Sequence, residues 1–145
     1  NLGYGNLVDQ LYKKVARPHI VNPIFLTEHP ISLSPLARAN DDDPTLTDRF
    51  QLVINGAEII NAYSELVDPQ EQERRLLEQA KLKANGDEEA MPMDYDYIDA
   101  MEYGMPPISG WGMGIDRIVQ LLTNSDNIKD VVLFPLMKNK EDISN

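Results

Sequence analysis

Two carboxylates lie in one short segment, residues 49–66, which also carries an amide and a phenol at close spacing. The carboxylates are Glu58 and Glu65, and the amide and the phenol are Asn61 and Tyr63. Carboxylate oxygens ligate Mg²⁺ or pair with a cation, and hydrogen-bonding groups beside them orient a bound ligand. The segment therefore indicates a site for a metal-bound phosphate and a cationic group. Ordinary solvent-facing carboxylates are the alternative interpretation.

A second candidate site lies in the glycine-rich stretch 107–125. It holds three alternating glycines followed by an arginine: Gly110, Gly112, Gly114 and Arg117. Glycines let a backbone approach a flat group such as a purine closely, while helix amides and an arginine can hold a polyphosphate. The spacing differs from the G-x-G-x-x-G of dinucleotide-binding folds, and the lysine of a P-loop is missing. A tight strand-to-helix turn with Arg117 in a surface salt bridge is the alternative interpretation.

The composition excludes several other kinds of site. The 145 residues include no cysteine and carry a formal net charge of −11. Without cysteine the chain has no disulfide, thiolate metal site or thiol nucleophile. An acidic surface repels the phosphates of nucleic acids, so any such contact would need basic residues from outside these residues. No apolar run reaches the roughly 20 residues of a membrane span and no signal-peptide pattern opens the chain, so we expect a cytoplasmic protein with no membrane partner.

The first candidate site depends on how its hairpin is paired. Asn55-Gly56 is the favoured dipeptide of a two-residue type I′ turn, so Ile54 should pair with Ala57. Counting on from the turn in ideal pairs sets Gln51 opposite Ile60 and puts four residues on one face: Gln51, Val53, Glu58 and Ile60. The two strands are thereby predicted to share a face that includes one of the carboxylates.

The same ideal count conflicts with the polar residues of the second strand. It places Asn61, Tyr63 and Glu65 on the opposite face, among the large apolar side chains. A polar trio and a packed core rarely share one face of a strand. We therefore predict a β-bulge near Ile59-Ile60, whose extra residue would turn the trio toward Glu58.

The rest of the chain predicts short helices and strands around this hairpin. Apolar spacing and capping residues predict helices at 6–16, 69–85, about 94–103 and 115–122, and strands at 23–30 and, buried, at 130–136. Hairpin-paired strands with helices between them predict one α+β domain over residues 1–145, built on an antiparallel β-sheet with flanking helices. His19 and His29 are expected to be structural.

Several stretches together resemble one family. "GWGMGIDR" resembles the third signature motif of class II aminoacyl-tRNA synthetases, a glycine-rich strand that leads to a helix with an arginine. The segments "INGAEIINAYSELVDP", "FLTEHPISLSPLAR", "GDEEAMPMDYDYIDAMEYGMPP" and "DVVLFPLMK" are similar to the lysyl-tRNA synthetases of that class. The similarity runs from about Leu7 to Lys138. It implies part of a class II catalytic domain that activates L-lysine with ATP to lysyl-adenylate and transfers the lysyl group to tRNA(Lys).

The resemblance also implies a role for each candidate residue. Arg117 would be catalytic, because it would hold the ATP tail and stabilise the charge that develops on pyrophosphate. Glu58 would bind Mg²⁺ between the phosphates, with Gln51 as a weaker second ligand where the family commonly has a glutamate. Glu65 would pair with the ammonium group of the substrate lysine. The other residues would line two pockets: Asn61 and Tyr63 that of lysine, and Gly110, Gly112 and Gly114 that of ATP.

The chain departs from the family in what it lacks. It shows no counterpart of the first two class motifs or of the N-terminal anticodon-binding domain. We therefore expect the C-terminal portion of a catalytic domain from a longer protein, a homodimer that binds tRNA through its other parts, with little activity in this portion alone. The alternatives are a non-catalytic module that binds lysine or an adenylate, and a synthetase paralogue that attaches a lysine-like amino acid to a protein.

Overall fold

The computed structural model describes residues 3–136 of the chain. These residues fall into two compact units, with the boundary between Met113 and Gly114. Across the described residues, no helix has both the length and the apolar character that crossing a membrane requires.

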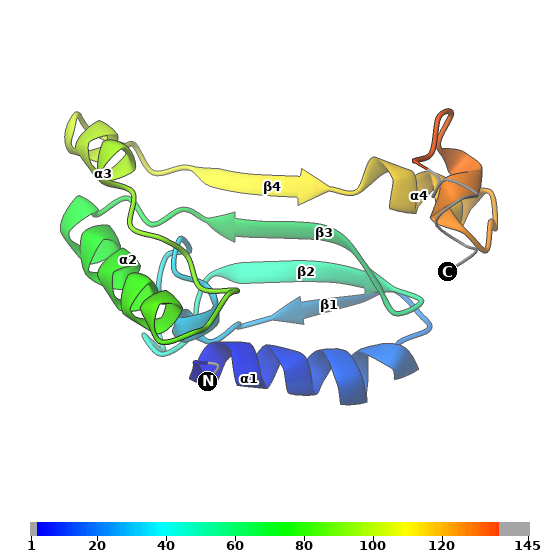
Figure 1. Cartoon of the computed structure of the whole chain (residues 1–145), viewed down its shortest axis with the longest axis horizontal. Coiled ribbons are helices and arrows are strands. Elements are labelled where there is room, and N and C mark those ends of the chain that lie inside the picture. The colour runs from blue at the N-terminus through cyan, green and yellow to red at the C-terminus, as the bar shows by residue number, and fades with distance from the viewer. Residues whose placement is uncertain (1–2, 137–145) are drawn as a thin grey trace, which may run out of the picture. The chain divides into compact units, whose positions relative to one another are not determined.

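The first unit is built on a four-stranded antiparallel sheet (Figure 1). Its strands are β1 (Ile24–Thr27), β2 (Arg49–Ile54), β3 (Ala57–Ser64) and β4 (Ser109–Met113), paired in the order β1-β2-β3-β4. The predicted antiparallel sheet with flanking helices, an α+β arrangement, is confirmed. The hairpin that carries the polar residues is central in this sheet, and the glycine-rich strand lies next to it.

The β2–β3 hairpin turns where the sequence predicts. Asn55 and Gly56 have φ values of 48° and 69°, and a type I′ turn requires positive φ at both central residues. Ile54 pairs with Ala57 across this turn, as predicted.

The predicted bulge is also present, and it corrects one predicted pair. The register shifts between Leu52 and Val53: Val53 pairs with Glu58 but Leu52 pairs with Ile60, so Ile59 is the extra residue. Gln51 consequently pairs with Asn61, and the predicted pairing of Gln51 with Ile60 is wrong. The ideal count places Gln51 opposite Ile60 because it does not include the bulge.

Helices α1 (Tyr4–Leu11), α2 (Pro69–Ala84) and α3 (Tyr95–Glu102) complete this unit. The predicted first helix continues beyond α1 through a π-helical turn, Tyr12–Ala16. The side chain of Asp68 caps α2 by accepting hydrogen bonds from the first free backbone amides, which satisfies donors that the helix itself leaves unpaired. Leu76 of α2 packs against Ile98 and Met101 of α3 in an apolar cluster at one end of the sheet.

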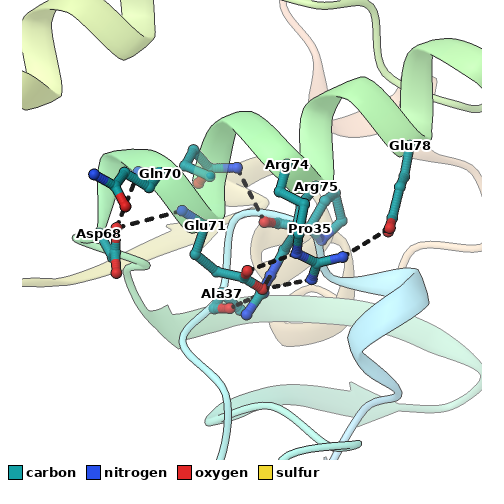
Figure 2. Close-up of polar contacts among 9 residues, drawn as sticks. Pro35, Ala37, Asp68, Gln70, Glu71, Arg74, Arg75 and Glu78 are labelled. Atoms are coloured by element: carbon teal, nitrogen blue, oxygen red, sulfur yellow. Dashed lines mark hydrogen bonds and ion pairs between the residues drawn. The ribbon is translucent and has the colours of Figure 1, made fainter.

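Helix α2 also holds a loop segment through buried polar side chains (Figure 2). Gln72 Nε2 donates to the Pro35 carbonyl at 3.1 Å, and Arg75 Nη1 donates to the Ala37 carbonyl at 2.8 Å. The Arg75 side chain is 6% exposed, and its Nε donates to Glu71 Oε1 at 2.7 Å. These contacts fix the 34–37 segment, which borders the polar face of the sheet.

The second unit contains α4 (Ile115–Leu122), as predicted, and a short 3-10 helix, Ile128–Val131. The buried strand predicted at 130–136 is wrong. Leu133 and Phe134 are 90% and 89% exposed, and neither belongs to a strand. A strand requires a neighbouring edge for its backbone hydrogen bonds, and none within residues 3–136 pairs with this segment.

Candidate functional site

The bulge at Ile59 brings the polar side chains of β2 and β3 onto one face of the sheet. Directly paired residues point to the same face, so Arg49 and Tyr63 share a face, as do Gln51 and Asn61 and also Val53 and Glu58. Two hydrogen bonds link these pairs: Arg49 Nε donates to Asn61 Oδ1 at 3.0 Å, and Gln51 Nε2 donates to Glu58 Oε2 at 2.7 Å. The predicted reorientation of Asn61 and Tyr63 toward the face of Glu58 is confirmed.

Strand β4 extends this face with a strip that has no side chains. Gly110 pairs with Tyr63 and Gly112 pairs with Asn61. A Cβ atom built on Gly110 would lie 2.5 Å from Glu65 Oε1, so the Glu65 carboxylate lies directly over this glycine. A Cβ atom on Gly112 would meet no atom of the described part of the chain within 4 Å. One glycine thus makes room for the carboxylate, and the other leaves an open strip beside Asn61.

The carboxylate of Glu65 is partly shielded from water. Burial raises the pKa of Glu65, because a carboxylate loses favourable contacts with water when it is enclosed. Burial and the nearby Glu65 charge also raise the pKa of Tyr63, and the same causes, with Tyr63 as a further neighbour, raise the pKa of Tyr97 on α3. A carboxylate beside two phenols gains most from a bound cation when water is scarce around it.

Arg49 belongs to this face and was missed in the sequence analysis. Its Nη1 donates to Ser34 Oγ at 2.8 Å, and burial lowers the pKa of its guanidinium. The signal was present, because Arg49 precedes Gln51 by two positions and therefore lies on the same side of β2. With Asn61 and Tyr63, Arg49 lines a cavity of about 160 Å³, which the 33–37 segment also lines.

A larger cavity, of about 420 Å³, lies against Gln51 and Glu58. His29 and Tyr12 also line it. His29 is buried, as its expected structural role implies, and burial together with the nearby Arg49 charge lowers its pKa, so the imidazole is neutral at pH 7.

The carboxylate of Glu58 suits a Mg²⁺ ion that is held mainly by phosphates, since one or two carboxylates plus phosphate oxygens are a common Mg²⁺ environment. Among residues 3–136 there is no group of three or more acidic or histidine side chains that could hold a metal by themselves. The second candidate ligand fits less well, because Gln51 presents its amide nitrogen, and not its oxygen, to Glu58.

Gly114 and Arg117 belong to the second unit. Gly114 is the N-cap residue of α4, and a Cβ atom built on it would lie 3.2 Å from Arg117 Cδ, so the arginine side chain folds back over the start of its own helix. Glu58 and Glu65 belong to the first unit. The roles that the family resemblance implies require these two acids and Arg117 to line one cleft, and this stays a prediction.

Known proteins are similar to this sequence over most of its length. The family model described as tRNA synthetases class II (D, K and N) matches residues 9–138, of which 137 and 138 lie outside the described residues. The chain is 52% identical over 138 residues to a lysine–tRNA ligase of Pelotomaculum thermopropionicum, and this match covers 95% of the chain and 27% of that relative.

Enterobacter sp. (strain 638) has a lysine–tRNA ligase that is 51% identical over 136 residues, which are 94% of the chain and 27% of that relative. The chain thus spans about a quarter of the length of the curated relatives that it matches. Since the family model matches nearly the whole chain, this protein belongs to the class II tRNA synthetases of the D, K and N group.

Proposed function

We propose that these residues form part of the catalytic domain of a lysine–tRNA ligase, which activates L-lysine with ATP and transfers it to tRNA(Lys). The observation that carries the proposal is the half-buried Glu65 carboxylate over Gly110, on the face that Asn61 and Tyr63 share. A poorly solvated carboxylate beside hydrogen-bonding groups suits an alkylammonium ligand. The two relatives named above are lysine–tRNA ligases, which supports lysine as that ligand.

In this proposal the lysine side chain is recognised by charge and shape. Glu65 pairs with the substrate ammonium, and this pairing offsets the desolvation that raises the Glu65 pKa. Tyr63 contributes its ring and Asn61 its amide to the walls of the lysine pocket. Arg49 holds Asn61 through the 3.0 Å hydrogen bond, so the amide is oriented before the substrate arrives.

ATP is proposed to lie along the glycine strip, with the adenine over Gly112, where no atom of residues 3–136 lies within 4 Å of an added Cβ. Glu58 would hold Mg²⁺, which when bound neutralises charge on the phosphates. The lysine carboxylate attacks the α-phosphorus, the bond to the β-phosphate bridging oxygen breaks, and pyrophosphate leaves with that bonding pair. Arg117 and the amides at the start of α4 would stabilise the leaving charge. No enzyme nucleophile is required.

The remaining properties of the enzyme are proposals that rest on the family. We infer that a longer protein supplies the tRNA-binding module, the ATP-clamping arginine of the second class motif and a homodimer interface. The proposed compartment is the cytoplasm, because tRNA is charged there and a sequence without cysteine is compatible with a reducing environment.

Lysine-dependent exchange of pyrophosphate into ATP tests the proposal in the full-length gene product. We expect exchange in the wild type, a severe loss in Glu65→Gln, and wild-type rates in Glu102→Gln, which changes an exposed glutamate of α3. Lysine binding with no exchange would instead identify a non-catalytic sensor. Exchange without aminoacylation of tRNA would identify the paralogue that modifies a protein, and exchange that depends on another amino acid would refute the assignment.

A further inference from the structure

Gln51 occupies the position at which a second Mg²⁺ ligand is expected, but its contacts point to a different role. Its Nε2 donates to Glu58 Oε2 at 2.7 Å, and its Oε1 faces His29 Nε2 at 3.2 Å. Gln51 is 9% exposed and His29 is 5% exposed. Both ends of the amide are therefore engaged in a largely buried chain of side chains that joins the segment after β1 to β3.

The chemistry of these three side chains fixes the direction of the hydrogen bonds between them. An ionised carboxylate only accepts hydrogen bonds, so the Gln51 amide must turn its nitrogen toward Glu58. The amide oxygen then accepts from His29, which makes Nε2 the protonated nitrogen of the imidazole.

The histidine is itself held in place. The His29 carbonyl accepts from the backbone N–H of Thr47 at 2.9 Å and from its Oγ1 at 2.9 Å. Thr47 is 1% exposed and precedes β2 by one residue. If the Gln51 amide rotated to offer its oxygen to a cation, it would lose the bond to Glu58 and set its NH₂ group against the N–H of His29.

We propose that Gln51 is a positioning residue that holds the Glu58 carboxylate and does not ligate the metal. The inference rests on the proposed function, because it assumes a nucleotide-bound divalent cation at Glu58. Donation to Oε2 restrains the Glu58 side chain, and the Gln51–Glu58 pair carries one negative charge where a pair of glutamates would carry two. Of these two residues, Glu58 alone therefore holds the cation, together with the phosphates of the nucleotide.

Mn²⁺ can report on this site without turnover. The full-length gene product is saturated with a non-hydrolysable ATP analogue, and the Mn²⁺ bound per active site is counted by electron paramagnetic resonance. The variants are Gln51→Leu, which removes both hydrogen bonds at similar volume, and Gln51→Glu, which adds a carboxylate. Gln70→Leu, at an exposed position of α2, is the matched control. The kcat of lysine-dependent exchange is measured for the same proteins.

We expect Gln51→Leu to bind the wild-type number of Mn²⁺ ions while its kcat falls by about tenfold or more, as is typical when the partner that orients a metal ligand is removed. Gln51→Glu should bind one additional Mn²⁺, and Gln70→Leu should match the wild type in both measurements. Loss of one Mn²⁺ in Gln51→Leu would show that Gln51 is a ligand and would overturn the inference. An unchanged kcat in Gln51→Leu, or no additional ion in Gln51→Glu, would overturn it as well.

Failure of the proposed function has a different signature. It would appear as a wild-type protein without lysine-dependent exchange, whatever its Mn²⁺ count. The number of ions bound by wild type and Gln51→Leu is compared without lysine, so this comparison decides the role of Gln51 separately.

Discussion

The position of Glu65 in the fold destabilises its charged form. Burial raises its pKa, which means that the folded protein disfavours the charged carboxylate relative to the unfolded chain. A carboxylate that stabilised the fold through an ion pair would show the opposite shift. The arrangement instead suits a residue whose charge is compensated when a cationic ligand arrives.

Glu65→Gln should therefore separate stability from function. The uncharged amide avoids the cost of burying a charge, so the thermal unfolding midpoint should stay the same or rise. The KM for lysine in the exchange reaction should increase by about 100-fold or more, because removing one member of an enclosed charge pair leaves the other unpaired. A variant that unfolds earlier, or binds lysine normally, would contradict this account, and Glu102→Gln serves as the control.

The same carboxyl predicts a pH dependence. Because its pKa is raised, Glu65 takes up its proton at a higher pH than an ordinary glutamate as the solution is acidified. The KM for lysine should then rise with falling pH, beginning above the range in which exposed carboxylates titrate. Exchange kinetics measured across the acidic range should show this rise of the KM for lysine in the wild type and not in Glu65→Gln. An identical pH profile in both proteins would exclude Glu65 as the source of the rise.

At the level of elements, β4 leaves room on the face of the candidate site because two of its residues are glycines. Gly110 and Gly112 lie on the same face of β4, but within the described residues only Gly110 has a side-chain atom directly above it. The two glycines are therefore a matched pair for testing what the strip accommodates.

We expect Gly112→Ala to leave the unfolding midpoint unchanged and to raise the KM for ATP by about tenfold, because the methyl group would occupy space that the ligand needs. Gly110→Ala would displace the flexible end of Glu65 and should raise the KM for lysine instead. Steady-state exchange kinetics with each substrate varied in turn distinguish the two. Equal effects of both variants on both substrates would argue against separate positions for adenine and lysine.

The ion pairs of Glu71 in helix α2 are expected to make the stability of the protein depend on pH. Hydrogen bonds from Arg74, followed by those from Arg75, lower the pKa of Glu71 to about 2. A lowered pKa contributes stability above the ordinary glutamate pKa of 4.5, and this contribution is lost as the pH falls from there toward about 2.

Glu71→Gln should destabilise the protein by about 1–3 kcal/mol at pH 7, because Arg75 would lose its carboxylate while remaining buried against Ala37. The difference from wild type should shrink as the pH falls below 4.5. Urea unfolding followed by circular dichroism at pH 7 and pH 3 measures both quantities, with Glu78→Gln on the exposed side of Arg74 as the control. A destabilisation that is equal at the two pH values would exclude the ion pair as its cause.

At the scale of the whole molecule, the sheet shows an apolar side as well as its polar one. Phe25 and Phe50 contact each other edge to face with ring centroids 5.5 Å apart, and Trp111 is 67% exposed. Trp111 pairs with Ala62, one position away from the glycines, and therefore lies on the side opposite to the candidate site. The exposed aromatic side of β4 and the side that carries the candidate site are thus separated by the alternation of side chains along a single strand.

The 145 residues alone are expected to have little or no exchange activity, whereas the full-length gene product is expected to be active. The expectation follows from the family, in which an arginine of the second class motif holds ATP from outside the matched region. Exchange assays of the two proteins at equal concentration check it. Ordinary rates from the isolated chain would show that its own residues suffice.

The sequence by itself determined the local elements and the family. Asn55-Gly56 allows few conformations other than a tight turn, and Asp68 followed by proline is a helix start, so both could be recognised without neighbours. The bulge was predictable because Asn61, Tyr63 and Glu65 could not share a face with the apolar residues of an ideal ladder. The glycine-rich motif and the hairpin segment together pointed to the class and to lysine.

The tertiary structure decided which side chains meet. Arg49 holds Asn61 because the bulge falls at Ile59 and shifts every later pair by one residue, and Gln51 contacts His29 because β1 pairs with β2 and the segment after β1 lies beside it. The strand predicted at 130–136 failed for a related reason, since an apolar run becomes a strand only where another backbone is available to pair with it. Turn and cap preferences act within a few residues of chain, whereas register, burial and hydrogen-bond partners depend on segments that the fold brings together.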